Sequence, residues 1–353
     1  MEISIGILAY NEEKAIASML DSLFAQSIFQ QSNPTTVEKI EIIVVPNGCS
    51  DSTAEVARKI LTDIAPKRNG LIWKVKELTT PGKSNAWNNY VHSLASSSAD
   101  YLFLVDSDIE FLEANTLESM LTTLEQQPDA WVAVDRPVKD IAIAKTKSPM
   151  EHLSALVSKI SGNKAEPGQP AWICGQLYCA RAEILRQIWL PLNIINDDSF
   201  IYTNVVTDRL RVPANPHRVI RAKEGSHLFE AYTDLPRLLR HEKWLIVGSA
   251  INELIYQDLQ ESDRDTASTI AERNRANSQW VRELIQRQAS TKGWWLIPNF
   301  ILIRRFLSLS QKPLLQSILL FPLAFSAFVL DAWLAFWANL ELHQGKGLGY
   351  WGK

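Results

Sequence analysis

The sequence predicts an α/β protein with a doubly wound, mostly parallel sheet, flanking helices and apolar helices at the C-terminus. Three observations support this fold class. Short apolar runs alternate with helical patterns through the first 110 residues. The connections between them are short, which favours right-handed crossovers. The chain also has 353 residues, more than a single core usually holds, so one large domain plus an appendage is expected.

Four strands and the helices between them are expected in the first part of the chain. "ISIGILAY" is the first strand, and "EEKAIASMLDSLFAQ" is an amphipathic helix with Ile16, Leu20 and Leu23 on one face. "KIEIIVVPN" is the second strand, followed by the helix "DSTAEVARKILTDIA", which Ser50 or Asp51 can cap. "LIWKVKEL" is the third strand, "GKSNAWNNYVHSLA" the next helix, and "DYLFLVDSD" the fourth strand.

The pattern loosens after about residue 140. The stretch "AKTKSPMEHLSALVSKISGNKAEPGQPAW" combines a short helix with the Gly, Pro and Asn residues typical of loops. "WICGQLYCARAEIL" predicts a strand that leads into a helix, and "DLPRLLRHEKWLIVGSAINELIYQDL" predicts a long helix with a basic start.

Polar residues follow each of the four predicted strands. They are Asn11, residues 47–51, residues 82–85 and residues 106–108. In doubly wound sheets, ligands bind outside the carboxyl ends of the strands. We therefore expect these four loops to meet in one crevice.

The stretch "YLFLVDSDIEF" ends an apolar strand in two carboxylates, Asp106 and Asp108. Two such carboxylates can share a divalent cation, which offsets their repulsion and prefers oxygen ligands. The cation can also bridge the oxygens of a diphosphate and stabilise its departure. The alternative is that one of the two residues caps the helix expected around "EANTLESML".

Taken in this order, "AYNEE", "NGCSDST", "PGKSNAWN", "DSD" and "NDD" resemble the motifs of the family 2 glycosyltransferases, over roughly residues 1 to 250. The resemblance implies the GT-A fold and inverting transfer of a sugar from a nucleotide-sugar, here a UDP-sugar, to a hydroxyl acceptor. It also implies Mg²⁺ or Mn²⁺ as the cofactor.

The predicted domain organisation has three parts. A GT-A catalytic domain is expected at 1–250, with a nucleotide-sugar half at about 1–110 and an acceptor half at about 110–250. A charged helical linker is expected at 251–292, and an apolar, membrane-associated helical tail at 293–353.

The resemblance assigns roles to the donor side of the crevice. Glu12 and Asp51 would contact the base and the ribose, and Lys83 would lie near the diphosphate. Asp106 would serve the ribose and the metal, and Asp108 the metal. Simpler roles are an acid at a helix start for Glu12, a helix cap for Asp51 and a solvated lysine for Lys83. The full set of donor-binding residues is Tyr10, Glu12, Asn47, Asp51, Lys83, Asp106, Arg240 and Lys243.

A second acidic pair, Asp197 and Asp198, is implied to be catalytic. By the resemblance Asp198 is the general base that takes the proton of the acceptor hydroxyl. Its neighbour would raise the pKa of Asp198 towards a useful range. The alternative is a cap for the helical turn "SFIYTNVV".

Further acceptor and donor contacts come from "RHEKW" at 240–244, which stands where processive family members have QxxRW. Lysine lacks the planar fork of arginine, so this departure disfavours processive polymer synthesis. Arg240 or Lys243 would lie near the diphosphate, and Trp244 and Gly175 near the acceptor. An interfacial basic helix is the alternative for this motif. His227 or His241 could supply a third metal ligand, although lone histidines are more often structural.

Composition narrows the cellular setting. Three cysteines suit reduced thiols in a cytosolic environment, and the N-terminus predicts a buried strand rather than a signal peptide. Six Lys or Arg and two acids follow residue 290, a net charge of +4, whereas the first 290 residues have 30 and 37, a net charge of −7. This distribution favours contact with anionic lipid headgroups, and nucleic acid is not expected as a partner.

The tail is the most apolar part of the chain, without charge over the eighteen residues from Pro313 to Leu330. It can be a spanning helix, a hairpin that breaks near Pro322 and lies in one leaflet, or a helix buried on the body. We expect membrane attachment with a cytoplasmic catalytic domain and a lipid or glycan acceptor. The alternatives for the whole chain are a nucleotidyltransferase-like enzyme and a non-catalytic membrane scaffold with the same fold.

Overall fold

The computed structural model describes residues 1–30, 37–64, 71–143, 166–231, 234–262, 264–291, 293–310, 312–345 and 348. Its centre is one eight-stranded sheet with the strand order β3-β2-β1-β4-β7-β6-β8-β5. The strands are β1 (Glu2–Ala9), β2 (Lys39–Pro46), β3 (Leu71–Val75), β4 (Tyr101–Asp106), β5 (Glu110–Phe111), β6 (Val132–Lys139), β7 (Leu177–Arg181) and β8 (Val219–Phe229).

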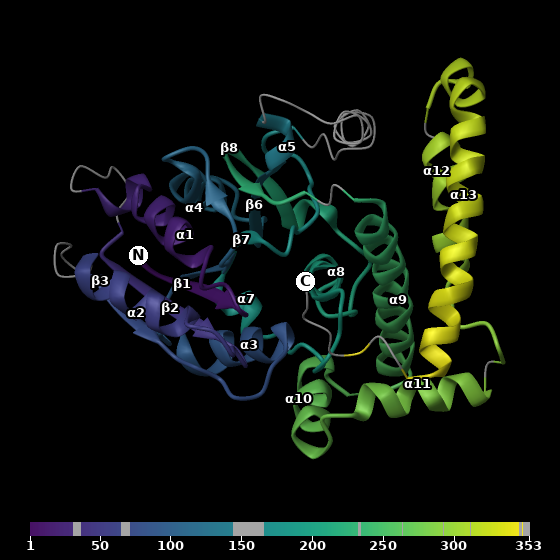
Figure 1. Cartoon of the computed structure of the whole chain (residues 1–353), viewed down its shortest axis with the longest axis horizontal. Helices are drawn as coiled ribbons and strands as arrows, with labels where there is room; N and C mark the ends of the chain where they lie inside the picture. The colour runs from purple at the N-terminus through teal and green to yellow at the C-terminus, as the bar shows by residue number, and fades with distance from the viewer. Residues whose placement is uncertain are drawn as a thin grey trace.

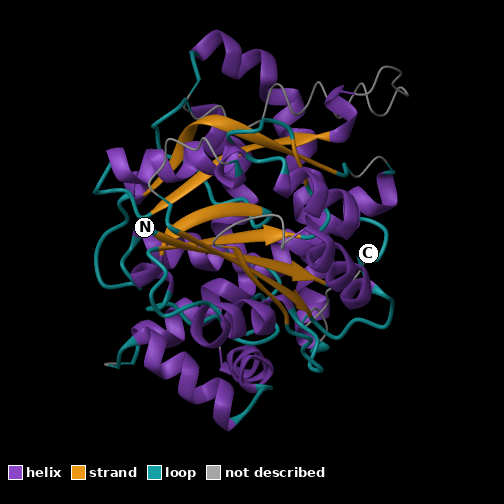
Figure 2. Cartoon of the chain, turned by 90° about the vertical axis from the view of Figure 1, so that its left-hand side faces the viewer, coloured by secondary structure: helices purple, strands orange, loops and turns teal. Residues whose placement is uncertain are grey.

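Helices cover both faces of this twisted sheet (Figures 1 and 2). On one face lie α1 (Ile16–Phe24), α2 (Thr53–Ile64) and α4 (Thr116–Gln126), which share a core with alternate strand residues such as Ile5 and Phe103. On the other face lie α3 (Lys83–Asn89), α7 (Ala182–Leu185), α8 (Asp197–Val206) and α9 (Leu235–Gln260), which pack against Leu102 and Leu104. The alternation of β4 between two cores explains its continuous apolar sequence.

The four predicted N-terminal strands are confirmed, and they are parallel to one another. The second half of the sheet is mixed, because β7 is antiparallel to both β4 and β6, while β6 is parallel to β8. A π-helical turn, η3 (Tyr90–Leu94), extends α3, and two 3₁₀ turns, η1 (Ser27–Phe29) and η4 (Pro216–Arg218), join other elements. The short helix α5 (Asp140–Ile143) follows β6, and the helix expected in the stretch after it lies outside the described residues.

The segment predicted as a charged linker is packed on the body. Helix α9 runs without a break past residue 250, and α10 (Thr266–Ala276) and α11 (Trp280–Thr291) follow it. Ile270, Trp280 and Ile285 belong to the same apolar core as α8 and α9. This part of the chain therefore extends the body, which a boundary at 250 did not anticipate.

The C-terminal region is a helical hairpin of α12 (Asn299–Ser310) and α13 (Leu314–His343), which lies beside α9 (Figure 1). Helix α12 ends at Ser310 and α13 begins at Leu314, so the predicted break near Pro322 is wrong: that proline lies inside α13. The described residues include one helix, α13, that is long and apolar enough to cross a membrane, with a mean hydropathy of 2.0 over its best window.

Asp331 divides α13 into two parts. Its side chain is 2% exposed and accepts hydrogen bonds from Arg304 at 3.0 Å and Arg305 at 2.9 Å, both on α12. Beyond it, Leu334, Ala338 and other residues are buried against the body, whereas most large side chains before it are exposed. The carboxylate is paired and desolvated, so it fastens the hairpin instead of interrupting the helix.

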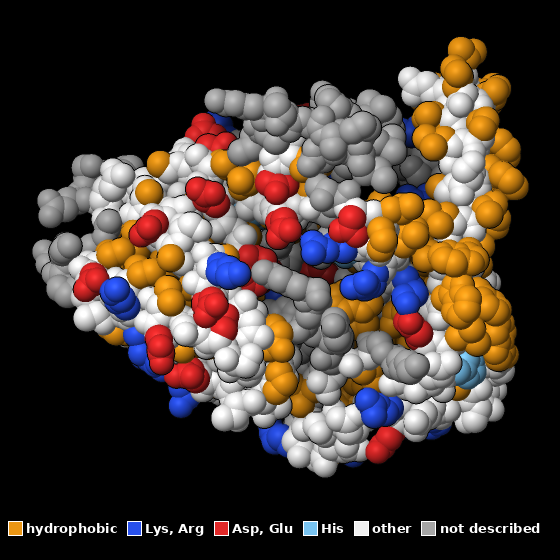
Figure 3. All heavy atoms as spheres, in the orientation of Figure 1, with side chains coloured by type: hydrophobic (Ala, Val, Ile, Leu, Met, Phe, Trp, Pro, Cys, Tyr) orange, Lys and Arg blue, Asp and Glu red, His pale blue; other side chains and the backbone are white. Residues whose placement is uncertain are grey.

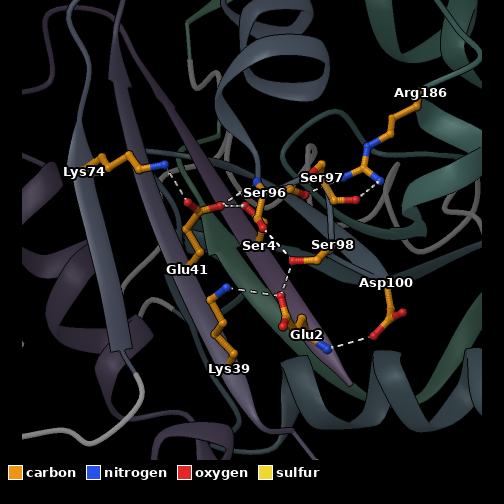
Figure 4. A network of polar contacts seen from close by, with 10 residues as sticks. All are labelled: Glu2, Ser4, Lys39, Glu41, Lys74, Ser96, Ser97, Ser98, Asp100 and Arg186. Atoms are coloured by element: carbon orange, nitrogen blue, oxygen red, sulfur yellow. Dashed lines mark hydrogen bonds and ion pairs between the residues drawn. The ribbon is translucent and has the colours of Figure 1, made fainter.

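A polar network closes the N-terminal ends of the strands (Figure 4). The Glu41 carboxylate accepts from Ser4 Oγ at 3.0 Å, from the Ser96 backbone N–H at 2.8 Å and from Lys74 Nζ at 2.8 Å. Lys39 Nζ lies 3.3 Å from the Glu2 carboxylate. Glu41 and Glu2 each have a lysine partner, and the hydrogen bond from the Ser96 backbone N–H to Glu41 attaches the segment before β4 to the sheet.

Candidate active site

The candidate site lies at the opposite, carboxyl end of the parallel strands. Lys83, the first residue of α3, places its Nζ 2.9 Å from the Asp106 carboxylate at the end of β4 and 3.1 Å from the Gly175 carbonyl oxygen. The Asp106 backbone N–H donates to the Gln176 carbonyl at 2.8 Å. One lysine thus joins two of the predicted loops and the segment before β7.

The second acidic pair reaches the same place from α8. Asp197 and Asp198 form its first turn, where the helix dipole favours acids. A Cβ built on Gly175 would lie 3.2 Å from Asp198 Cβ and 3.5 Å from Lys83 Nζ. A side chain at this position would be crowded against Asp198, so glycine at 175 suits the close approach of this loop to Lys83 and Asp198.

Helix α9 supports the acidic pair from behind. Asn252 Nδ2 donates to the Asn196 carbonyl at 2.8 Å, directly before Asp197. A Cβ on Gly248 would lie 2.7 Å from Asn196 Cβ. The backbone that holds the pair is therefore packed directly on α9, which fixes its position.

The charges of the site are coupled. Burial and the nearby Asp197 raise the pKa of Asp198 to about 6. Burial likewise raises the pKa of Asp106 to about 6, although the Lys83 ammonium opposes the shift. Burial alone would lower the pKa of Lys83, but Asp106, Asp197 and Asp198 raise it above its usual range. Asp198 is therefore ionised at neutral pH with enough basicity to accept a proton.

The loops that follow β1 and β2 are joined to each other by hydrogen bonds. The Asp51 carboxylate accepts from the Glu13 backbone N–H and from the Thr53 backbone N–H, both at 3.1 Å. Glu12 is buried, and its backbone N–H donates to Thr53 Oγ1 at 2.8 Å. Asp51 thus has the predicted capping role at α2, and Glu12 lies one loop away from it.

Asn11 and Asn47 shape the same region. Asn11 adopts a left-handed conformation with φ 55°, and its Oδ1 accepts from the Ser50 backbone N–H at 2.8 Å. Asn47 is fully buried and donates to the Gly82 carbonyl at 2.6 Å, directly before Lys83. Tyr10 is half-buried at the end of β1. Asn47 therefore acts on the loop that carries Lys83, a positioning role within the predicted donor set.

Asp106 and Asp108 do not cap α4, which was their alternative role. The first turn of α4 has other acceptors, since the Leu117 backbone N–H donates to Gln26 Oε1 at 3.2 Å and the Ser119 backbone N–H donates to the Asn115 carbonyl at 2.8 Å. Asp108 is exposed two residues beyond the end of β4. Asp108 is therefore accessible to a ligand, and Asp106 is held by Lys83.

The oxygen atoms of Asp106 and Asp108 are suitable ligands for a divalent cation that also binds a diphosphate. No cluster of three or more His, Cys, Asp or Glu side chains that could hold a metal occurs among the described residues. Asp108 and Asp106 supply hard oxygen atoms, and Mg²⁺ is often bound by one or two carboxylates together with substrate phosphates. The two carboxylates therefore fit a cation of this kind.

Neither histidine joins this pair as a third ligand in the described arrangement. His227 is fully buried, with Nδ1 2.8 Å from Asp135 and Nε2 3.1 Å from Gln176 Oε1. Burial would lower the pKa of His227, but Asp135 raises it to about 10. His241 is half-buried on α9, where burial lowers its pKa. Both ring nitrogens of His227 already have protein partners, which accounts for its place in the core.

The RHEKW segment forms part of α9. Lys243 makes an ion pair with Glu341 of α13, so its charge is engaged with the hairpin. Arg240 is exposed, and Trp244 is half-buried on the same helix. Contacts of these three residues with donor or acceptor remain predictions.

The sequence did not indicate a stacked pair of aromatic side chains beside Gly175 and α8. Trp172 lies three residues before Gly175, and its ring stacks on that of Tyr202, with centroids 4.0 Å apart. Tyr202 follows Asp198 by one helical turn. That spacing was the available signal, since residues four apart share a face of a helix.

Comparisons with known proteins agree with the resemblance in the sequence. Residues 4–189 match the family model described as glycosyl transferase family 2. None of the curated proteins compared with the chain matches it significantly.

Similar solved structures include S. aureus TarS 1–349, with 18% identity over 100% of this chain and 93% of that one, at a TM-score of 0.45. The same fragment in complex with UDP has 17% identity, the same coverage and a TM-score of 0.45. M. tuberculosis glucosyl-3-phosphoglycerate synthase has 19% identity over 71% of this chain and 80% of that one, at a TM-score of 0.41. Because the family model covers more than half of the 353 residues, the chain belongs to glycosyltransferase family 2.

Proposed function

We propose that this glycosyltransferase moves a sugar from a UDP-sugar to a hydroxyl of a lipid-linked or glycan acceptor, with Mg²⁺ or Mn²⁺, at a membrane surface. The observation that carries the proposal is the meeting of Lys83, Asp106, Gly175 and Asp198. It joins the end of β4, the start of α3 and the start of α8 within hydrogen-bond and van der Waals distance. A single cation faces several carboxylates there, which suits a site that acquires further positive charge with its ligand.

The chain's own residues account for an inverting displacement. Asp198 takes the proton from the acceptor hydroxyl, and the acceptor oxygen forms a bond to the anomeric carbon. The bond from that carbon to the diphosphate oxygen breaks, and its electron pair leaves with the diphosphate. Lys83 offsets the negative charge that develops there. One base on one side and one leaving group on the other invert the anomeric configuration.

Asp108 and Asp106 would hold the cation together with the diphosphate. When bound, the cation offsets the charge of the leaving nucleotide. Glu12 and Asp51 would bind the base and ribose, because the loops that carry them are tied together at the end of β1 and β2. The uracil N–H can donate a hydrogen bond to a carboxylate or carbonyl oxygen.

A panel of nucleotide-sugars with UDP, GDP, ADP and dTDP leaving groups tests the donor. We expect hydrolysis of a UDP-sugar that requires Mg²⁺ or Mn²⁺, measured by release of the nucleoside diphosphate. Failure to hydrolyse or transfer from any donor in the panel, with or without metal, contradicts the proposal. Hydrolysis of a GDP- or dTDP-sugar alone corrects only the identity of the base.

Thermal denaturation tests the metal site separately. UDP with Mn²⁺ should raise the melting temperature of the wild type, and Asp108→Ala should abolish the part that depends on Mn²⁺. Asp129→Ala is the matched control, because Asp129 is an exposed aspartate in the turn after α4. An unchanged Mn²⁺-dependent shift in Asp108→Ala rules out Asp108 as a ligand.

The hairpin supports the membrane part of the proposal. Its exposed side chains are mostly apolar and lie along one flank of the molecule (Figure 3). Leu314 and Leu319 are 78% and 74% exposed, and Trp333 and Trp337 are also exposed. Exposed apolar patches of this kind mark membrane or protein contacts. Tryptophans are enriched at the membrane–water interface.

The hairpin geometry favours insertion into one leaflet over a full crossing. Helix α12 has 12 residues, a length of about 18 Å, whereas the hydrocarbon core is about 30 Å thick. A crossing by α13 would require α12 to cross back with Arg304 and Arg305 at mid-depth. Both arginines are instead paired with Asp331 beside the body. We therefore propose that the hairpin lies in the interface, with both of its ends on the side of the body.

Sedimentation with lipid vesicles tests this attachment. The full chain should bind vesicles, and Leu315→Glu with Leu319→Glu should reduce binding about tenfold or more, because both side chains are exposed on α13. Ile72→Glu, an exposed apolar position on β3, should leave binding unchanged. The alternative outcome is a wild type that does not bind vesicles but forms a concentration-dependent dimer, which dissociates in the double variant. That result would assign the apolar face of the hairpin to contact with a second copy of the chain.

A further inference from the structure

Trp172 exposes a large aromatic surface in the middle of the catalytic body. Its side chain is 60% exposed, although its neighbours Ala171 and Ile173 are buried. The backbone around it is fixed, since the Ala171 N–H donates to the Val219 carbonyl at 3.0 Å and Pro170 bridges to Ile220. The outward position of the ring is therefore built into the fold and does not come from a loose loop.

One face of this indole is supported by a second ring. The ring of Tyr202 on α8 stacks on it at 4.0 Å, with an interplanar angle of 26°. With one face against Tyr202 and most of its surface exposed, the indole presents its other face to solvent. Tyr202 holds the orientation of Trp172, and together they form what we call the aromatic platform.

The platform is carried by the same two elements as the proposed base. Trp172 precedes Gly175 by three residues, and Tyr202 follows Asp198 by four, on the same face of α8. Gly175 and Asp198 are themselves in close contact. The platform therefore extends the site on the β7 side. The loops proposed to bind the nucleotide lie on the other side, after β1 and β2.

We propose that Trp172 and Tyr202 bind the acceptor, and that the acceptor presents a pyranose ring to them. One face of a pyranose carries several C–H groups, which suit the negative face of an aromatic ring, and hydroxyls surround its edge. With the ring on the platform, an edge hydroxyl reaches towards Asp198. This inference rests on the proposed function and adds to it the chemical class of the acceptor at the reacting end.

Ligand-detected saturation-transfer NMR on the full chain tests the platform without any donor. The probes are the methyl glycosides of β-D-glucose, β-D-galactose, N-acetyl-β-D-glucosamine and α-D-mannose. Tetraethylene glycol monooctyl ether, below its micelle concentration, is the apolar probe without a sugar ring. We expect at least one glycoside to bind, with transfer strongest to protons on one face of its ring.

Four variants give the test its resolution. Trp172→Ala should weaken binding of that glycoside about tenfold, and Trp172→Phe less, because it keeps a flat ring. Tyr202→Ala should also weaken it, since Trp172 loses its support. Trp333→Ala, which removes an exposed tryptophan of α13, should have no effect. Circular dichroism and melting curves confirm that each variant is folded.

The outcomes separate this inference from the proposed function. Glycoside binding that is unchanged in Trp172→Ala overturns the platform, as does the absence of binding by every glycoside. Equal, Trp172-dependent binding of the octyl ether overturns the pyranose and assigns the surface to an alkyl chain. Donor hydrolysis is measured separately on the wild type. Its absence from the wild type would count against the proposed function and leave the glycoside result standing.

Discussion

The two ends of the central sheet differ in how the charges of their side chains are balanced. At the N-terminal end, Glu41 forms an ion pair with Lys74, and Glu2 forms one with Lys39 (Figure 4). Each of these two glutamates therefore has its own lysine. At the carboxyl end, Lys83 is the ion-pair partner of Asp106. Asp197 and Asp198 also lie close enough to Lys83 to raise the pKa of this lysine.

The difference indicates what each end is for. A balanced network lowers the energy of the folded chain and needs no further partner. The carboxylates there cost stability in the free protein, because burial and, to a smaller extent, the repulsion of like charges raise the pKa values of Asp198 and Asp106. A ligand that brings protons or cations would offset that cost, as expected of the proposed binding and catalytic site.

The largest expected effect comes from Asp198→Asn at the unbalanced end. Transfer should fall about 10²- to 10⁴-fold, because the amide cannot accept the proton. Binding of the nucleotide, measured by calorimetry, should change less than about twofold. Asp129→Asn is the control, an exposed aspartate remote from the site. Retained transfer in Asp198→Asn would remove this residue as the base.

The same variant should be more stable than the wild type at pH 7. The folded-state pKa of Asp198, about 6, exceeds its ordinary value of 3.8. The unfolded chain therefore releases this proton first, and stability declines as pH rises from about 4 to 6. Asp198→Asn removes that loss, so we expect a melting temperature about 2–4 °C higher at pH 7 and a smaller difference at pH 4.5. A lower melting temperature at pH 7 contradicts the charge imbalance.

Lys83→Met should reduce both donor affinity and the pH range of activity. Loss of a charged hydrogen bond of about 1.5–3 kcal/mol corresponds to about 10- to 100-fold weaker donor binding. Lys83 lowers the pKa of Asp198, so its removal should move the acid limb of the pH–rate profile from about 6 to higher pH. Lys59→Met, an exposed lysine on α2, is the control. An acid limb that stays in place shows that the lysine does not act on the base.

Glu41→Ala tests the balanced end. It leaves Ser4, the Ser96 N–H and Lys74 without their acceptor, so the free energy of unfolding should fall by about 1–3 kcal/mol. Glu41→Gln keeps an acceptor oxygen and should cost less. The turnover number should not change in either variant, as measured with saturating donor. A large loss of turnover in the folded variant would show that the two ends are not independent.

The smallest effect is expected for Lys39→Met. Its ion pair with Glu2 is partly exposed, at 36% and 31% for the two side chains. Such pairs contribute about 0–1 kcal/mol and are screened by salt. Urea denaturation should show a change below about 1 kcal/mol that vanishes in 1 M NaCl. A larger change would mean that Lys39 belongs to the cooperative network around Glu41.

The first half of the fold was predictable because its signals are local. An apolar run, a polar strand end and a helical pattern recur four times, and topology then brings the strand ends together. The strand order β7-β6-β8-β5 was not predictable, because it depends on both parallel and antiparallel pairings between segments far apart in the sequence. The break predicted near Pro322 does not occur, because α13 continues through this proline. Ser326 Oγ donates a hydrogen bond to the Pro322 carbonyl within the helix.

The candidate site was predictable in its parts and less so in its contacts. Asp106, Lys83 and Asp198 were each expected near the crevice, but the bond from Lys83 to Asp106 needs the relative positions of α3 and β4. The pairing of Lys243 with Glu341 spans 98 residues. No local pattern predicts such a contact, because it forms only once the hairpin has docked on α9.

Helix α9 lies between the acidic pair and the hairpin. Gly248 and Asn252 pack on the backbone at Asn196, while Lys243 of the same helix binds Glu341 on α13. If the hairpin rests on a bilayer, this helix sets the height of the base above the lipid headgroups. An acceptor anchored in the bilayer would then be selected by the length of its own stalk, independently of the chemistry of its sugar. Acceptors with stalks that are too short or too long would be poor substrates even when their sugar ring fits.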